Sequence, residues 1–82
     1  MEHELTLHAR QRMQERSIPL RLVEQGIANP DKISIDAKGV MLLKKVLLIK
    51  GRQRLLLIAG QIVGKRFKIF TVIDTSKVKK YL

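Results

Sequence analysis

The chain has 82 residues, a hydrophobic fraction of 45% and a formal net charge of +10. This length predicts one domain, residues 1–82, with a small core, and the apolar content favours a globular fold over disorder. Without cysteine the chain forms neither disulfides nor thiolate metal sites, which suits the cytoplasm. The longest charge-free stretch, residues 55–64, is far shorter than the roughly 18 residues of a membrane span. The acidic opening also differs from a basic signal peptide, so we expect no membrane partner.

The positive charge is concentrated in the second half of the chain. Residues 1–41 contain six Lys or Arg and six Asp or Glu, whereas residues 42–82 contain eleven Lys or Arg and one acid, Asp74. Such asymmetry predicts a polyanionic partner, with nucleic acid first, an acidic protein second and anionic lipid third. Alternatively, the lysines only maintain solubility and protect exposed strand edges from aggregation.

The chain opens with a predicted helix over residues 7–16, for which Thr6 is a suitable N-cap. At 100° per residue, Leu5, Ala9 and Met13 form one apolar stripe, which we expect to pack on the rest of the fold.

Three further side chains, His8, Arg12 and Arg16, recur every four residues along this helix. Their positions beside or within the apolar stripe predict that they lean towards the surface on which the helix packs. A buried guanidinium is unfavourable unless it is paired. Either the arginine stems cover the core while their heads reach solvent or a carboxylate, or the three residues form a cationic site between helix and sheet. For His8 alone, a structural role is the commoner one.

A second helix is predicted to begin at Pro19 and to end at Asn29-Pro30. Its expected apolar face consists of Leu20, Val23 and Ile27.

Two strands are predicted next. Residues 32–36 alternate, with Ile33 and Ile35 expected to point inward. Residues 40–50 form a second strand, with a bulge expected at Lys44-Lys45 because the alternation changes phase there. A turn at residues 51–53 leads into the following strand.

The last two strands form a long hairpin around Gly64-Lys65, because a two-residue turn between apolar runs requires the positive φ that glycine supplies. A short C-terminal helical turn follows. The predicted fold is therefore α+β, with an N-terminal helical hairpin packed on a four-stranded antiparallel β-meander.

The sequence lacks most of the residue patterns on which enzyme active sites are built. We find no converging carboxylates, glycine-rich phosphate loop, nucleophile triad or histidine pair, and we expect neither a metal nor a cofactor. Cleavage of RNA needs none of these, because the 2′-hydroxyl is the nucleophile. A protein must only accept a proton, donate one and stabilise the charge on phosphorus, for which His, Lys, Arg and Tyr suffice.

Three segments of the chain carry a resemblance: HARQRMQERSIPLRLVEQGIANPD, RLLLIAG and KIFTVIDTSKVKKYL. They resemble a prokaryotic domain family of unassigned function that has the pattern H-x-x-x-R-M-x-x-R-x-I, a second helix ending in N-P, and a T-V strand near the C-terminus. That family is distantly similar to the BrnT and RelE toxin endoribonucleases, which share a helical hairpin on a four-stranded antiparallel sheet.

The resemblance implies a metal-independent endoribonuclease of toxin–antitoxin type that acts on free or ribosome-associated RNA and has a small acidic antitoxin as partner. The catalytic residues that it implies are His8, Arg12, Arg16 and Thr71. The nucleic-acid-binding residues that we expect are Arg54, Lys77, Lys79, Lys80 and Tyr81. Lys80 and Tyr81 only resemble the basic, aromatic tail of RelE-type toxins.

Two alternatives stay open. The chain could be a nucleic-acid-binding module without catalysis, in which the same charges bind phosphates. It could instead be a protein-interaction module, either an antitoxin-bound partner or a homodimer formed through the strand at residues 40–50 as an exposed edge.

Overall fold

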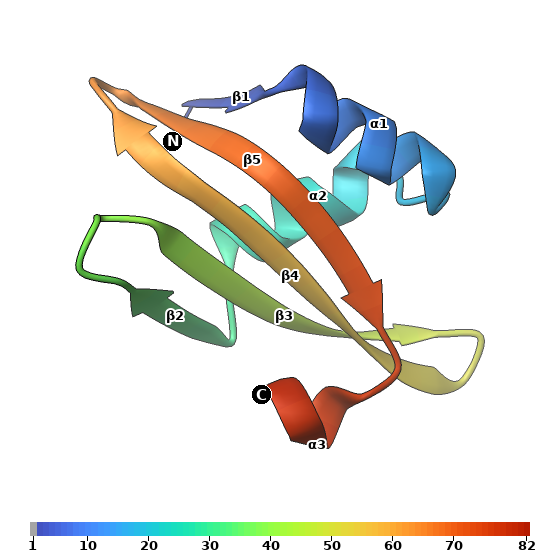
Figure 1. Cartoon of the computed structure of the whole chain (residues 1–82). Helices are drawn as coiled ribbons and strands as arrows, with labels where there is room; N and C mark the ends of the chain where they lie inside the picture. The colour runs from blue at the N-terminus through green and yellow to red at the C-terminus, as the bar shows by residue number, and fades with distance from the viewer. Residues whose placement is uncertain (1) are drawn as a thin grey trace.

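The computed structural model describes residues 2–82, which form an α+β fold of five strands and three helices (Figure 1). In chain order the elements are β1 (Glu2–Leu5), α1 (Leu7–Glu15), α2 (Leu20–Ala28), β2 (Lys32–Ile35), β3 (Met41–Ile49), β4 (Arg52–Val63), β5 (Arg66–Thr75) and α3 (Val78–Tyr81).

The five strands form one mixed sheet in the order β1-β5-β4-β3-β2. Three neighbouring pairs, β2 with β3, β3 with β4 and β4 with β5, are antiparallel. β1 pairs with β5 in parallel, from Glu2 opposite Arg66 to Leu5 opposite Ile69. The predicted four-stranded antiparallel meander is therefore wrong. It missed β1 because three of the four residues in this strand are polar, so the segment has no apolar alternation to detect.

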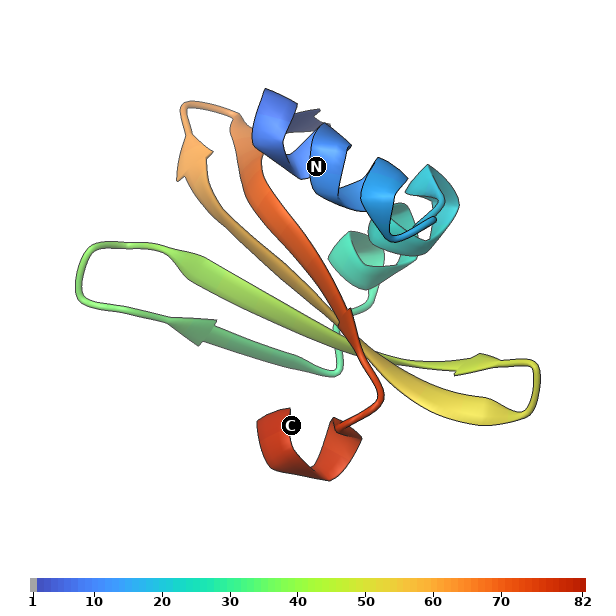
Figure 2. The same cartoon turned by 45° about the vertical axis from the view of Figure 1, so that its right-hand side comes forward.

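The helices lie on both sides of the sheet (Figure 2). α1 packs against β5 and β1, and α2 packs against β4 and β3, on the face that we call the inner face. α3 packs against β4 on the opposite, outer face. The sheet therefore presents one face to a helical hairpin and the other to a single short helix.

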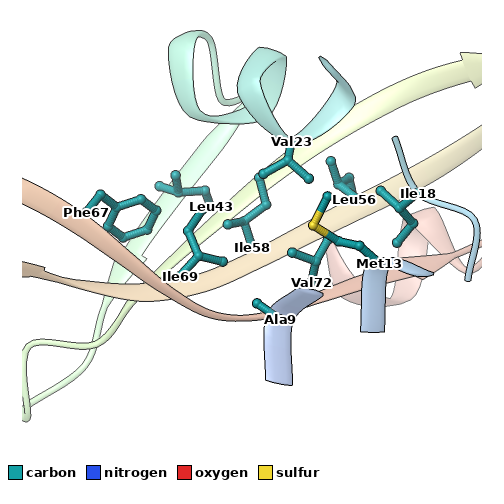
Figure 3. Packing of buried hydrophobic residues seen from close by; sticks show 10 residues of the cluster. All are labelled: Ala9, Met13, Ile18, Val23, Leu43, Leu56, Ile58, Phe67, Ile69 and Val72. Atoms are coloured by element: carbon teal, nitrogen blue, oxygen red, sulfur yellow. The ribbon is translucent and has the colours of Figure 1, made fainter. Parts of the chain in front are cut away.

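The main core lies between the helical hairpin and the sheet, as Figure 3 shows. α1 contributes Ala9 and Met13 and α2 contributes Val23, as predicted. Leu5 packs against the same cluster from the end of β1 and not from α1. Leu20 is 44% exposed, contrary to expectation. The buried members are Ala9, Met13, Ile18, Val23, Leu43, Leu56, Ile58, Phe67, Ile69 and Val72.

The predicted bulge at Lys44-Lys45 is absent, since β3 pairs with β4 in continuous register from Met41 to Ile49. The apolar phase changes there because Lys45 occupies an inner-face position. Its side chain is only 17% exposed, and its ammonium lies 3.9 Å from Asp31 Oδ2. A long lysine stem can lie along apolar surface while its charged end finds a partner, so alternation is broken without a bulge.

The irregularity lies instead in β5, where Phe70 is inserted between two residues that pair with adjacent positions of β4. Ile69 pairs with Gly60, and Thr71 pairs with Ala59. Gly60 permits the close approach of the two strands, because a Cβ there would contact the Lys68 carbonyl and lie 2.8 Å from the Phe67 ring.

All three hairpin turns contain a residue with positive φ, beginning with Gly39 (φ +82°) between β2 and β3. Gly64 has φ +63° at the predicted β4–β5 turn, which is confirmed. The β3–β4 turn lies at Lys50-Gly51, slightly earlier than expected, since Ile49 already pairs with Arg52.

Candidate functional site

α3 is held across the outer face by two lysines of the sheet. Lys44 Nζ donates to the main-chain O of Tyr81 at 2.6 Å, and Lys32 Nζ donates to the main-chain O of Leu82 at 2.8 Å. Lys32 and Lys44 are direct neighbours on β2 and β3. The last carbonyls of a helix have no intrahelical donor and carry partial negative charge, so cations are favourable there.

α3 packs against β4, which carries a buried residue, Leu55, on its outer face. This residue is fully buried, yet it lies outside the main core, because its neighbours Leu56 and Ile58 alternate with it towards the other face. The half-buried Val78 begins α3. Packing against β4 and two lysine hydrogen bonds thus fix the position of a helix whose other side chains are mostly basic.

The basic residues of α3 and its N-cap, the two lysines that hold this helix and the neighbouring tyrosine form a group that we call the outer cationic surface. Among residues 2–82, none of its lysine side chains lies within salt-bridge distance of an Asp or Glu side chain. Tyr81 is 42% exposed, and Lys80 Nζ lies 5.4 Å from the centre of its ring. The outer cationic surface consists of Lys32, Lys44, Lys77, Lys79, Lys80 and Tyr81.

Four of these six residues are ones for which the sequence predicted a nucleic-acid-binding role. Lys77 is the N-cap of α3, and Lys79, Lys80 and Tyr81 lie on the helix. Sequence reasoning missed Lys32 and Lys44. Their alternation with apolar neighbours could have placed both on one face of the sheet. Nothing local in the sequence indicated that the C-terminal turn would cross that face.

The structure separates Arg54 from the outer cationic surface. Its Nε donates to Asp74 Oδ1 at 2.6 Å, and both side chains are partly buried at 34% and 25% exposure. Asp74 pairs with Leu56, an inner-face residue of the main core. Arg54 therefore neutralises a carboxylate beside the core.

His8 and Arg16 are exposed and Arg12 is half-buried, so the expectation that all three side chains lean towards the sheet is wrong. Ala9 and Met13 form the buried stripe of α1. His8 and Arg12 each precede one of these residues, so their side chains are rotated by 100° around the helix axis away from the stripe. Within the column, Arg12 Nε donates to His8 Nε2 at 3.4 Å.

The other predicted catalytic residue, Thr71, belongs to a different side of the sheet. It pairs with Ala59, whose neighbour Ile58 faces the main core, so Thr71 lies at an outer-face position. Arg12 Nη1 meanwhile lies 3.4 Å from Glu15 Oε2, with both side chains well exposed. The described residues thus contain a His8–Arg12 pair but do not unite it with Thr71 or with the lysines of α3.

Residues 2–82 contain neither a candidate metal-binding cluster nor a helix that could span a membrane. No group of three or more His, Cys, Asp or Glu side chains is placed to hold a metal ion. No helix in this range has the length and apolar character needed to cross a membrane. Comparisons of the chain with protein-family models, with curated proteins and with solved structures found no match.

Proposed function

We propose that the protein binds single-stranded RNA through the outer cationic surface. The observation that carries this proposal is the seating of α3, whose last two main-chain oxygens accept from Lys44 and Lys32. This arrangement gathers five lysines beside an exposed tyrosine without an opposing carboxylate in the described chain. Lysines bind phosphates, and an accessible aromatic ring is a stacking platform for an unpaired base.

RNA is favoured over DNA because the sequence resembles a domain family that is itself distantly similar to toxin endoribonucleases. The same charges could hold a small acidic antitoxin, which would then compete with RNA for the surface.

Binding is tested by fluorescence anisotropy with a labelled single-stranded RNA over a range of salt concentrations. The triple variant Lys77→Gln/Lys79→Gln/Lys80→Gln should bind more weakly at every salt concentration. Each phosphate contact contributes about 0.7 to the slope of log affinity against log salt for single strands, so losing three contacts should reduce the slope by about 2.

A matched control removes three lysines from the turns, Lys38, Lys50 and Lys65, and changes the net charge equally. This control should retain most of the affinity and slope. Equal losses in the two triple variants would mean that total charge, not the outer cationic surface, determines binding, and the proposal would fail.

A second candidate is metal-independent cleavage of RNA at α1, favoured by the contact between Arg12 Nε and His8 Nε2. An exposed imidazole can exchange protons while the guanidinium stabilises charge on phosphorus. The test is incubation with RNA in EDTA. His8→Ala should then reduce cleavage by about 100-fold or more. His3→Ala, which alters the other histidine of the chain, should not. Absence of cleavage would remove this candidate and leave RNA binding unaffected.

A further inference from the structure

The β2 strand forms one edge of the sheet and carries exposed isoleucines. All four of its residues are exposed, with Ile33 at 51% and Ile35 at 64%. The sequence predicted that both point inward, but they occupy inner-face positions that the helical hairpin leaves uncovered. An open edge with apolar side chains is a template for pairing with another strand. The edge belongs to β2 and not, as expected, to residues 40–50, because β3 lies between β2 and β4 over Met41–Lys44.

The hydrogen-bond phase of β2 shows which main-chain groups are free at this edge. Beyond the end of the strand, Asp36 N–H donates to Val40 O at 3.0 Å, continuing the register with β3. Hydrogen-bonded and non-hydrogen-bonded positions alternate along an antiparallel pair, so Ser34 also bonds to β3. Ile33 and Ile35 therefore direct their N–H and C=O groups outward.

We propose that β2 pairs in antiparallel fashion with β2 of a second copy of the chain, around a two-fold axis at Ser34. The two five-stranded sheets would then join into one continuous sheet. In this register Ile33 faces Ile35 of the second copy, and the outward N–H and C=O groups of both residues form the ladder. The pairing is isologous, because each strand offers the other the same groups.

Charge complementarity argues for a second copy as the occupant. The same register places Lys32 opposite Asp36 of the second copy, at a position where side chains approach closely. Asp36 Oδ1 accepts from the N–H groups of Lys38 and Val40, which leaves Oδ2 for the lysine. Lys32 uses one of its three donors on Leu82. Shifting the two-fold axis to either isoleucine would lose these charge pairs.

An apolar depression at the same edge offers space for the isoleucines of the second copy. Ile33 forms part of its wall, and Ile35 of the second copy would lie directly beside Ile33. The depression is lined by Ile27, Pro30, Ile33, Met41, Leu43 and Phe67.

Pairing about this axis has a consequence for RNA, which rests on the proposed function. Directly opposed residues of an antiparallel pair share a face of the sheet, so both outer faces lie on the same side of the joined sheet. The two outer cationic surfaces, each with Lys32 now paired with Asp36 of the other copy and four lysines left for phosphates, would lie on one extended face. RNA long enough to span both would bind more tightly than to one.

Disulfide crosslinking tests the pairing without RNA, since the chain has no native cysteine. Ser34→Cys should form a disulfide-linked dimer under mild oxidation, because the two-fold axis brings the cysteines face to face at a non-hydrogen-bonded position. Ser76→Cys, at an exposed serine before α3, is the matched control. Preassociation raises the effective thiol concentration, so crosslinking at Ser34 should be at least about tenfold faster. About 0.3 M salt limits repulsion between the two positively charged copies.

Two further variants in the Ser34→Cys background separate the isoleucine contact from non-specific association. Ile35→Lys should slow crosslinking to the rate of the Ser76→Cys control. Leu48→Lys, at a residue that is 73% exposed and lies beyond the β2–β3 pairing, should leave the rate unchanged. Both sites are exposed, so the fold should tolerate either lysine, which circular dichroism can verify. Equal rates at Ser34 and Ser76, or equal slowing by the two lysines, would overturn the proposal and leave the edge to a different protein.

Discussion

Arg54 shows how a charged side chain that the sequence suggests for ligand binding can instead serve the fold. Asp74 is the single acid among residues 42–82, and its Oδ1 lies 2.6 Å from Nε of Arg54 on the adjacent strand. From the sequence, Arg54 is one of eleven basic residues with no sign of a preferred partner. The pairing depends on the register between β4 and β5 and on the bulge that shifts it, neither of which the sequence specified.

A double-mutant cycle should reveal the difference between this pair and an exposed one. We expect Arg54→Ala and Asp74→Ala to show a coupling energy of about 1–2 kcal/mol in urea unfolding, because the hydrogen bond is charge-assisted and both groups are partly buried. The exposed pair between Arg12 and Glu15 should couple by about 0.5 kcal/mol or less. Equal coupling in the two cycles would mean that Arg54 contributes little to the fold and is available to a phosphate.

At the scale of an element, α1 begins where the sequence predicted, because its start signal is local. Thr6 Oγ1 accepts from Ala9 N–H at 3.1 Å, as an N-cap does. The same hydroxyl donates to Phe70 O at 3.2 Å, and Thr6 N–H donates to Ile69 O at 3.1 Å. The cap thus joins the first helix to the bulge of β5, a connection across the whole sequence that a local signal cannot predict.

Removing the Thr6 hydroxyl should therefore lower the free energy of unfolding by more than the loss of an N-cap that makes no other contact. Thr6→Ala is expected to lower the free energy of unfolding by about 1–2 kcal/mol and to speed amide exchange at Ala9. Thr6→Ser keeps both hydrogen bonds and should remain within about 0.5 kcal/mol of the parent chain. A serine variant as unstable as the alanine variant would assign the effect to the lost methyl group and not to the cap.

The elements that the sequence predicts and those that it does not differ in the sequence range of the interactions that form them. Gly64 at a turn and Asn29 at a helix end act through their own backbone conformations, so a few neighbouring residues suffice to predict them. β1 exists only because β5 offers it hydrogen bonds more than 60 residues along the chain. The position of α3 likewise depends on lysines of β2 and β3. The sequence predicted residues of the candidate site on α3, but not the sheet lysines that complete it.

At the scale of the whole molecule, folding brings together charges that the unfolded chain keeps apart. Repulsion between like charges destabilises the folded state of a chain with net charge +10. The outer cationic surface concentrates that repulsion at α3 and at the two lysines that hold it. Salt screens such repulsion over a Debye length that falls from about 10 Å at 0.1 M to about 3 Å at 1 M. The thermal stability of the protein should therefore rise with added sodium chloride.

The triple variant Lys77→Gln/Lys79→Gln/Lys80→Gln should be more stable than the parent chain at low salt and should respond less to added salt. Glutamine and lysine have similar helix propensities, so the substitution changes the intrinsic helix stability little. We expect the lost interaction of Lys79 and Lys80 with the C-terminal end of α3 to be smaller than the repulsion that is relieved. For a domain of this size, each gain of about 1 kcal/mol raises Tm by roughly 4–8 °C, which calorimetry resolves.

Substituting Lys38, Lys50 and Lys65 by glutamine lowers the net charge by the same three units but leaves the outer cationic surface intact. This second variant should retain most of the salt response, because its lysines lie in separate turns. If both variants respond to salt alike, the repulsion is spread over the molecule, and α3 holds no special concentration of charge for a polyanion to neutralise.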